Sequence, residues 1–166
     1  MLAKLEKDII NVYDENNILI GGIKTQSNYK NAKFIIGEKI YQLSRDKWST
    51  KISENGKVKF NLKTSSFSGK TDILETNHKI TGVFGLKWAT QMVDNQNNTL
   101  LKIRNESQFV EKYKYEIEIS DKNVTALEIL TTLYGHLYGS KMKTQAVIIG
   151  VISGISGGII MFTMLK

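Results

Sequence analysis

The feature that most constrains this chain is a run of twenty residues, 146–165, without a single charged side chain. The run reads AVIIGVISGISGGIIMFTML, and as a helix it would be about 30 Å long, which matches the hydrocarbon core of a bilayer. Lys141 and Lys143 precede the run and Lys166 follows it. Cations on the near side of a span favour a cytoplasmic location for the preceding domain. We therefore expect residues 146–165 to form one transmembrane helix that anchors the chain by its tail.

The alternative for this run is a helix buried as a plug inside the domain. The run holds four glycines, and each would cost a water-soluble helix nearly 1 kcal/mol relative to alanine. Gly150, Gly154 and Gly158 recur at every fourth residue, so they share one helix face and would let two helices approach closely. The spacing therefore predicts a membrane helix that self-associates through this face, with an unpaired anchor as the open alternative.

Residues 9–120 have a β pattern, in which short apolar runs alternate with clusters of Asn, Asp, Gly and Ser. The predicted strands include 18–20, 33–36, 48–52, 58–62 and 113–119, and hairpin turns are predicted at 14–17, 54–57 and 94–98. The strand at 113–119 alternates strictly, which places Tyr113, Tyr115, Ile117 and Ile119 on one face. Strands at such regular spacing indicate a barrel or a sandwich.

After residue 120 the period changes to that of a helix. Thr125 and Glu128 have the spacing of a capping box, and the helix that follows, to about Tyr138, is apolar nearly all round, which is typical of a buried helix. It is too short to cross a membrane, so a barrel with a helix through its middle is the natural arrangement. His136 lies on this helix and is interpreted as a core histidine with satisfied hydrogen bonds. The chain thus divides into a domain (1–140, with the helix at about 125–139), a basic linker (141–145) and the transmembrane helix (146–165).

Several of these segments together resemble one known family. The run ITGVFGLKW at 80–88, Val93–Asp94, LLKI at 100–103, the strand at 113–119 and the apolar helix resemble the tubby C-terminal-like superfamily, which also includes LURP-one-related proteins and phospholipid scramblases. VYDEN at 12–16 resembles the early strand and turn of its short bacterial members. The resemblance covers roughly residues 9–139. It implies a twelve-stranded barrel around a central hydrophobic helix and an association with membrane or lipid.

The resemblance does not carry a ligand site with it. No basic motif matches the lipid ligands of tubby proteins at an identifiable position, and the run at 146–165 is an addition to the short members. In scramblase-like proteins the final helix has been interpreted both as membrane-spanning and as barrel core. In this chain we expect two separate segments for these roles, with the helix at about 125–139 as barrel core and residues 146–165 as the membrane span.

No arrangement of residues in the sequence points to catalysis, since no Ser, His and Asp spacing resembles a nucleophile elbow and no pair of carboxylates lies in an apolar setting. The chain has no cysteine, which excludes disulfides, thiol nucleophiles and cysteine-based zinc sites, and its two histidines are His78 and His136. Residues 64–71 end like a phosphate-binding loop but lack its first glycine and its helix. We therefore expect no enzyme activity, no cofactor and no metal.

The net charge of +7, from 23 basic and 16 acidic residues, has two interpretations: an anionic partner, or a lysine-rich solvated surface without one. Beside a membrane anchor we expect that partner to be anionic phospholipid and not nucleic acid, with Lys141 and Lys143 as headgroup contacts. Further basic residues crowd the first third of the chain: Lys24, Lys30, Lys33, Lys39, Arg45, Lys47 and Lys51. Which of them point together cannot be worked out from the pattern.

The function that we expect is a membrane-anchored, non-enzymatic binding or scaffold module. Residues 1–8 have acidic side chains and no apolar run, so they do not form a secretory signal and the domain is expected to face the cytoplasm. Two alternatives stay open. One is scramblase-like lipid translocation by an oligomer, and the other is a bacterial immunity or membrane-stress protein.

Overall fold

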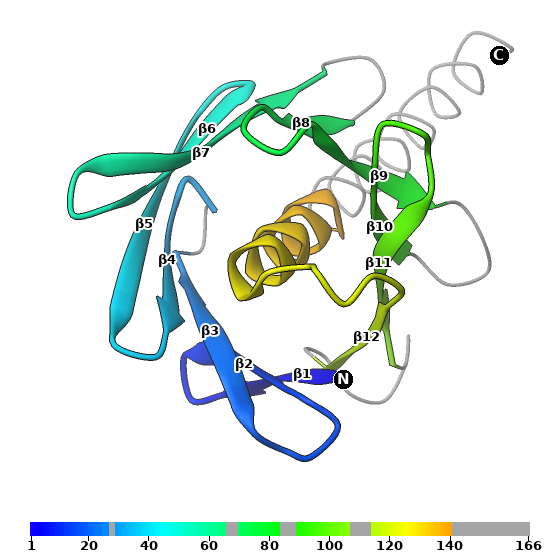
Figure 1. The fold of residues 1–166 in the computed structure, drawn as a ribbon. Coiled ribbons are helices and arrows are strands. Elements are labelled where there is room, and N and C mark those ends of the chain that lie inside the picture. The colour runs from blue at the N-terminus through cyan, green and yellow to red at the C-terminus, as the bar shows by residue number, and fades with distance from the viewer. Residues whose placement is uncertain (27–28, 66–69, 84–88, 107–113, 141–166) are drawn as a thin grey trace, which may run out of the picture.

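A computed structural model describes residues 1–26, 29–65, 70–83, 89–106 and 114–140 of the chain. Within these residues, twelve antiparallel strands form a closed barrel in which each strand pairs with its neighbours in the sequence and β1 pairs with β12 (Figure 1). The strands are β1 (Leu2–Glu6), β2 (Ile9–Tyr13), β3 (Leu19–Thr25), β4 (Asn31–Ile36), β5 (Lys39–Asp46), β6 (Ser49–Glu54), β7 (Lys57–Thr64), β8 (Thr71–Ile73), β9 (His78–Val83), β10 (Ala89–Val93), β11 (Thr99–Asn105) and β12 (Lys114–Ile119).

The three predicted hairpin turns are confirmed, and each has a local cause. In the β2–β3 turn, Asp14 Oδ1 accepts two backbone N–H groups at 2.8 and 2.9 Å. Asp94 Oδ1 does the same in the β10–β11 turn, at 2.8 Å in both cases. The β6–β7 turn has Asn55 and Gly56 at φ of 49° and 78°, the left-handed pair that a two-residue hairpin needs.

The strand β1 was not predicted, because it has no apolar run. Its one buried residue is Ala3, which pairs with Tyr115 of β12 and Val12 of β2. Backbone pairing on both sides closes the barrel and leaves no free edge among the described strands. On β12, Tyr115 and Ile117 point inward and are buried, as the alternation predicted. Ile119, at the end of the strand, is 37% exposed, and Tyr113 lies outside the described residues.

A helix at residues 126–140 lies inside the ring of strands (Figure 1). Its apolar side chains join those of the strands in one core: Ile129, Leu130, Leu133, Tyr134 and Leu137. Gly21 of β3 allows one close approach, since a Cβ there would lie 3.2 Å from Leu130 Cδ1 and 2.7 Å from the Ile35 carbonyl oxygen. The barrel and the hydrophobic helix that the family resemblance implies are therefore both present.

The helix gives the barrel two distinguishable ends. At the start of the helix, Glu128 contacts His78, the first residue of β9. Near its end, Tyr138 contacts Arg45, close to the end of β5. We call the end where the helix starts the entry end; it holds the connections that follow the even-numbered strands. The end where the helix finishes is the exit end, and it holds the connections that follow the odd-numbered strands.

The helix at 126–140 is the last element of the described chain. Within the described residues, no helix is both long enough and apolar enough to cross a membrane. The linker at 141–145 and the expected transmembrane helix at 146–165 lie outside the described residues. The membrane anchor therefore stays a prediction.

Candidate functional site

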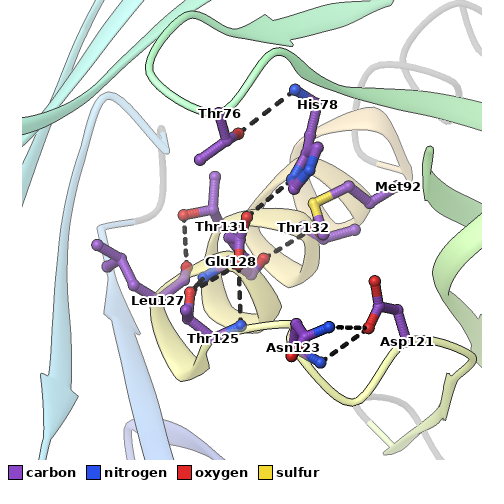
Figure 2. A network of polar contacts seen from close by, with 10 residues as sticks. All are labelled: Thr76, His78, Met92, Asp121, Asn123, Thr125, Leu127, Glu128, Thr131 and Thr132. Atoms are coloured by element: carbon purple, nitrogen blue, oxygen red, sulfur yellow. Dashed lines mark hydrogen bonds and ion pairs between the residues drawn. The ribbon is translucent and has the colours of Figure 1, made fainter. Parts of the chain in front are cut away.

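The start of the helix is held by a buried carboxylate, that of Glu128, whose residue is 4% exposed (Figure 2). Its Oε2 accepts hydrogen bonds from the backbone N–H of Thr125 at 2.9 Å and from the Thr125 hydroxyl at 2.8 Å, and the Glu128 N–H returns one to that hydroxyl at 3.3 Å. The predicted capping box is therefore confirmed. Oε1 lies 2.8 Å from Nδ1 of His78 on β9, so the carboxylate also ties the helix to the barrel wall.

The second buried polar group is His136, which is fully buried near the end of the helix. Its Nε2 lies 2.7 Å from Asn105 Oδ1 and its Nδ1 lies 3.0 Å from the Thr90 hydroxyl. Because an amide oxygen only accepts, Nε2 carries the proton and Nδ1 accepts from Thr90. Burial lowers the pKa of His136 from 6.5 to about 4. The interpretation of His136 as a satisfied core histidine is confirmed.

The last turns of the helix are fastened to the exit end of the barrel. The Tyr134 hydroxyl donates to the backbone oxygen of Tyr29 at 2.6 Å, and burial raises its pKa. The Arg45 guanidinium lies 3.8 Å from the centre of the Tyr138 ring, within the range of a cation–π contact. These contacts direct residue 140 toward the exit end.

The two ends of the barrel carry opposite charge. Among the described residues, the entry-end connections hold one cationic side chain, that of Lys122, and six carboxylates: Asp14, Glu15, Glu38, Glu75, Asp94 and Asp121. The described exit-end connections hold two carboxylates, Asp8 and Glu106, and four lysines: Lys7, Lys30, Lys47 and Lys70. The potential around the barrel is therefore more positive at the exit end, where the helix finishes.

A groove of about 710 Å³ lies on the outer face of β3 to β6 and reaches the start of β7. It runs along the barrel wall between the two ends, with Gln26 at the exit end and Val58 near the entry end. Its exposed polar side chains come from four neighbouring strands: Lys24, Asn31, Lys33, Gln42, Ser44 and Lys51. Three cations and several amide and hydroxyl groups thus share one concave surface.

Strand register explains why these lysines meet. Lys24 is directly opposite Lys33 in the β3–β4 pair, and like charges at opposite positions of an antiparallel pair repel. Lys51 is opposite Ser44, in the neighbouring row of the same face. Lys24 forms an ion pair with Asp8. Lys33 and Lys51 form no ion pair with any described residue, so their charges are available to an anionic ligand.

The structure shows which basic residues of the first third of the chain lie together, which the sequence pattern could not. Of the seven in the first third of the chain, Lys24, Lys33 and Lys51 line the groove, whereas Arg45 contacts Tyr138. The predicted headgroup contacts, Lys141 and Lys143, and the predicted helix-association residues, Gly150, Gly154 and Gly158, lie outside the described residues. The groove itself was not predicted, because it depends on the register between β3 and β4.

Metal binding finds no support in the described part of the chain, where no three histidine or carboxylate side chains gather in a way that would hold an ion. The two histidines have separate partners, since His78 contacts Glu128 and His136 contacts Asn105 and Thr90. The groove is therefore the best-supported candidate for a functional site, and its chemistry is that of an anion-binding surface.

Comparisons with known proteins do not assign the chain to a family. No family model matches it, and neither the curated proteins nor the solved structures contain a match. A function for this chain therefore has to be inferred from the residues of the groove and of the two barrel ends.

Proposed function

We propose that this chain is a membrane-anchored, non-enzymatic binding module of the tubby C-terminal-like type, which holds the anionic headgroup of a phospholipid in the groove on β3 to β6. The observation that carries the proposal is the position of Lys33 and Lys51, which face the groove without a carboxylate partner among the described residues. A phosphate headgroup would supply the missing negative charge. Gln42, Ser44 and Asn31 line the same groove and would donate hydrogen bonds to phosphate oxygens.

Anchoring by the tail supports the choice of a lipid over a soluble anion. The uncharged run at 146–165 has the length and composition of a membrane span, and the helix at 126–140 leaves only a short stretch before it. A groove tethered to a bilayer meets lipid headgroups at a high effective concentration. The row of Gly150, Gly154 and Gly158 would allow two anchors to associate, which would bring two grooves to one patch of membrane.

The buried titratable side chains already have partners within the fold, which favours binding over catalysis as the function. Glu128 holds the start of the helix, and His136 is neutral and contacts two uncharged partners. Neither group faces the groove. The groove offers cations, amides and hydroxyls, which suit the recognition of an anion and supply no general base.

The proposal can be tested by measuring which phospholipid co-purifies with the protein. The full chain is purified from detergent micelles that contain equal amounts of phosphatidylglycerol and phosphatidylcholine, and the bound lipids are extracted and quantified. We expect phosphatidylglycerol to be enriched with the native chain. The double variant Lys33→Glu/Lys51→Glu should lose most of this enrichment, because it reverses both unpaired charges of the groove.

The matched control reverses two lysines outside the groove, Lys39→Glu/Lys122→Glu, which changes the net charge by the same amount. This control should keep the enrichment of the native chain. Equal lipid ratios in the native chain and in both variants would contradict the proposal. An equal loss in both variants would contradict it too, because the effect would then come from net charge and not from the groove.

A further inference from the structure

The turn between β5 and β6 combines an aromatic side chain with a cation at the exit end. It consists of Lys47 and Trp48, and Trp48 is 50% exposed. The Trp48 backbone oxygen accepts a hydrogen bond from the Thr64 N–H at 2.7 Å, which fastens the turn to the end of β7. The indole is therefore presented to the surroundings from a turn that is fixed to two strands.

A half-exposed tryptophan beside lysines has the chemistry of a membrane interface. Tryptophan is enriched at headgroup level because its ring is apolar and its N–H is polar, and lysine side chains are attracted to an anionic leaflet. Most of the other exposed large apolar residues of the described chain lie at or near the entry end: Ile18, Leu19, Ile40, Val58, Leu74 and Ile119. The described connections of that end also carry six carboxylates, however, which an anionic leaflet repels.

We infer that the exit end of the barrel lies against the anionic bilayer, with Trp48 at the interface and Lys7 and Lys47 at headgroup level. This inference rests on the proposed function and adds the orientation of the domain to it. The end of the helix supports it, because residue 140 finishes at the same end. The groove supports it also, because Lys24 and Gln26 carry the groove toward the exit end, where a headgroup of the adjacent leaflet is within reach.

Tryptophan fluorescence of the full chain in vesicles tests this orientation. The chain has two tryptophans, so the variant Trp88→Phe leaves Trp48 as the single reporter. The variant is reconstituted into vesicles of phosphatidylcholine with phosphatidylglycerol. We expect the Trp48 emission to shift to shorter wavelength relative to the detergent-solubilised chain, and to be quenched by brominated acyl chains.

The matched control reports on the opposite end of the barrel. In a chain with Trp48→Phe and Trp88→Phe, the substitution Ile18→Trp places the single tryptophan at an exposed position of the entry end. Its emission should not shift in the same vesicles, and aqueous iodide should quench it. The charge reversal Lys7→Glu/Lys47→Glu should reduce the shift of Trp48, whereas Lys122→Glu should leave it unchanged.

The outcomes separate this inference from the function on which it rests. If the chain floats with the vesicles but Trp48 remains fully accessible to iodide, the orientation is overturned and the binding function stands. A shift of Trp48 and of the tryptophan at position 18 alike would overturn the orientation as well. If the chain does not float with the vesicles at all, both the orientation and the membrane function are overturned.

Discussion

Lys24 and Lys33 are directly opposite each other on β3 and β4, and both line the groove on the outer face of the barrel. Of the two, Lys24 has a carboxylate partner, Asp8, on the neighbouring β1–β2 turn. Two lysines at opposite positions repel, so this arrangement does not serve the stability of the sheet. An anionic ligand between the strands would relieve the repulsion.

The first prediction concerns the stability cost of this lysine pair. Replacing Lys33 by glutamine removes one charge and keeps a long polar side chain. We expect the free energy of unfolding of Lys33→Gln to stay unchanged or to rise by up to about 0.5 kcal/mol, while the enrichment of phosphatidylglycerol falls. Urea denaturation of the full chain in detergent measures the stability.

The control for this prediction is Lys39→Gln, outside the groove at the start of β5. It should change neither the stability, beyond about 0.5 kcal/mol, nor the lipid enrichment. If the free energy of unfolding fell by more than about 1 kcal/mol in Lys33→Gln and not in the control, Lys33 would stabilise the fold. Its position in the groove would then no longer support anion binding.

A second prediction follows from the burial of His136. Its pKa is about 4 in the folded chain and near 6.5 in an unfolded chain, so the unfolded state binds more protons between these two values. The free energy of unfolding must therefore fall as the pH falls from about 6.5 toward 4, by roughly 3 kcal/mol for this one group. None of its contacts, Thr90, Asn105 and the Tyr115 ring, carries a charge that would offset the loss.

The variant His136→Gln isolates this contribution from the carboxylates that also titrate at acidic pH. The native chain should be the more stable of the two at pH 7, and its advantage should shrink steadily toward pH 4. Urea denaturation at several pH values measures the difference. An advantage that is constant across this range would mean that the histidine is not desolvated in the folded chain.

The third prediction separates the two roles of Glu128. Glu128→Ala removes both the cap on the helix and the contact with His78, and should cost roughly 2 to 3 kcal/mol of stability. Glu128→Gln keeps an acceptor for the Thr125 N–H and removes the charge, and should cost about 1 kcal/mol. Equal losses in the two variants, measured by urea denaturation, would mean that the cap contributes nothing beyond the charge.

Features that depend on neighbouring residues were the ones that the sequence predicted well. Asp14 and Asp94 define their turns by hydrogen bonds within four residues, and Asn55–Gly56 has the backbone preference of a hairpin. Thr125 and Glu128 lie one helical turn apart. Each of these patterns specifies its geometry without help from the rest of the fold, so each could be predicted before the fold was known.

Features that depend on pairing between distant strands could not be predicted in this way. The strand β1 has a single buried residue, Ala3, and is held by backbone pairing with β12, more than a hundred residues away. Lys24 and Lys33 meet only because the register of β3 and β4 places them opposite each other. The partners of His136 are likewise remote, since Asn105 is 31 residues away and Thr90 is 46.

The central claim is that this barrel works while tethered to a membrane by residues 146–165. Extraction of cell membranes with alkaline carbonate tests it most directly, with the full chain and a chain that ends at residue 145 expressed side by side. We predict that the full chain remains in the membrane pellet, and that the shortened chain is recovered in the supernatant with the β-rich circular dichroism of a folded barrel. Recovery of the full chain in the carbonate supernatant, or a shortened chain that is unfolded, would contradict the account.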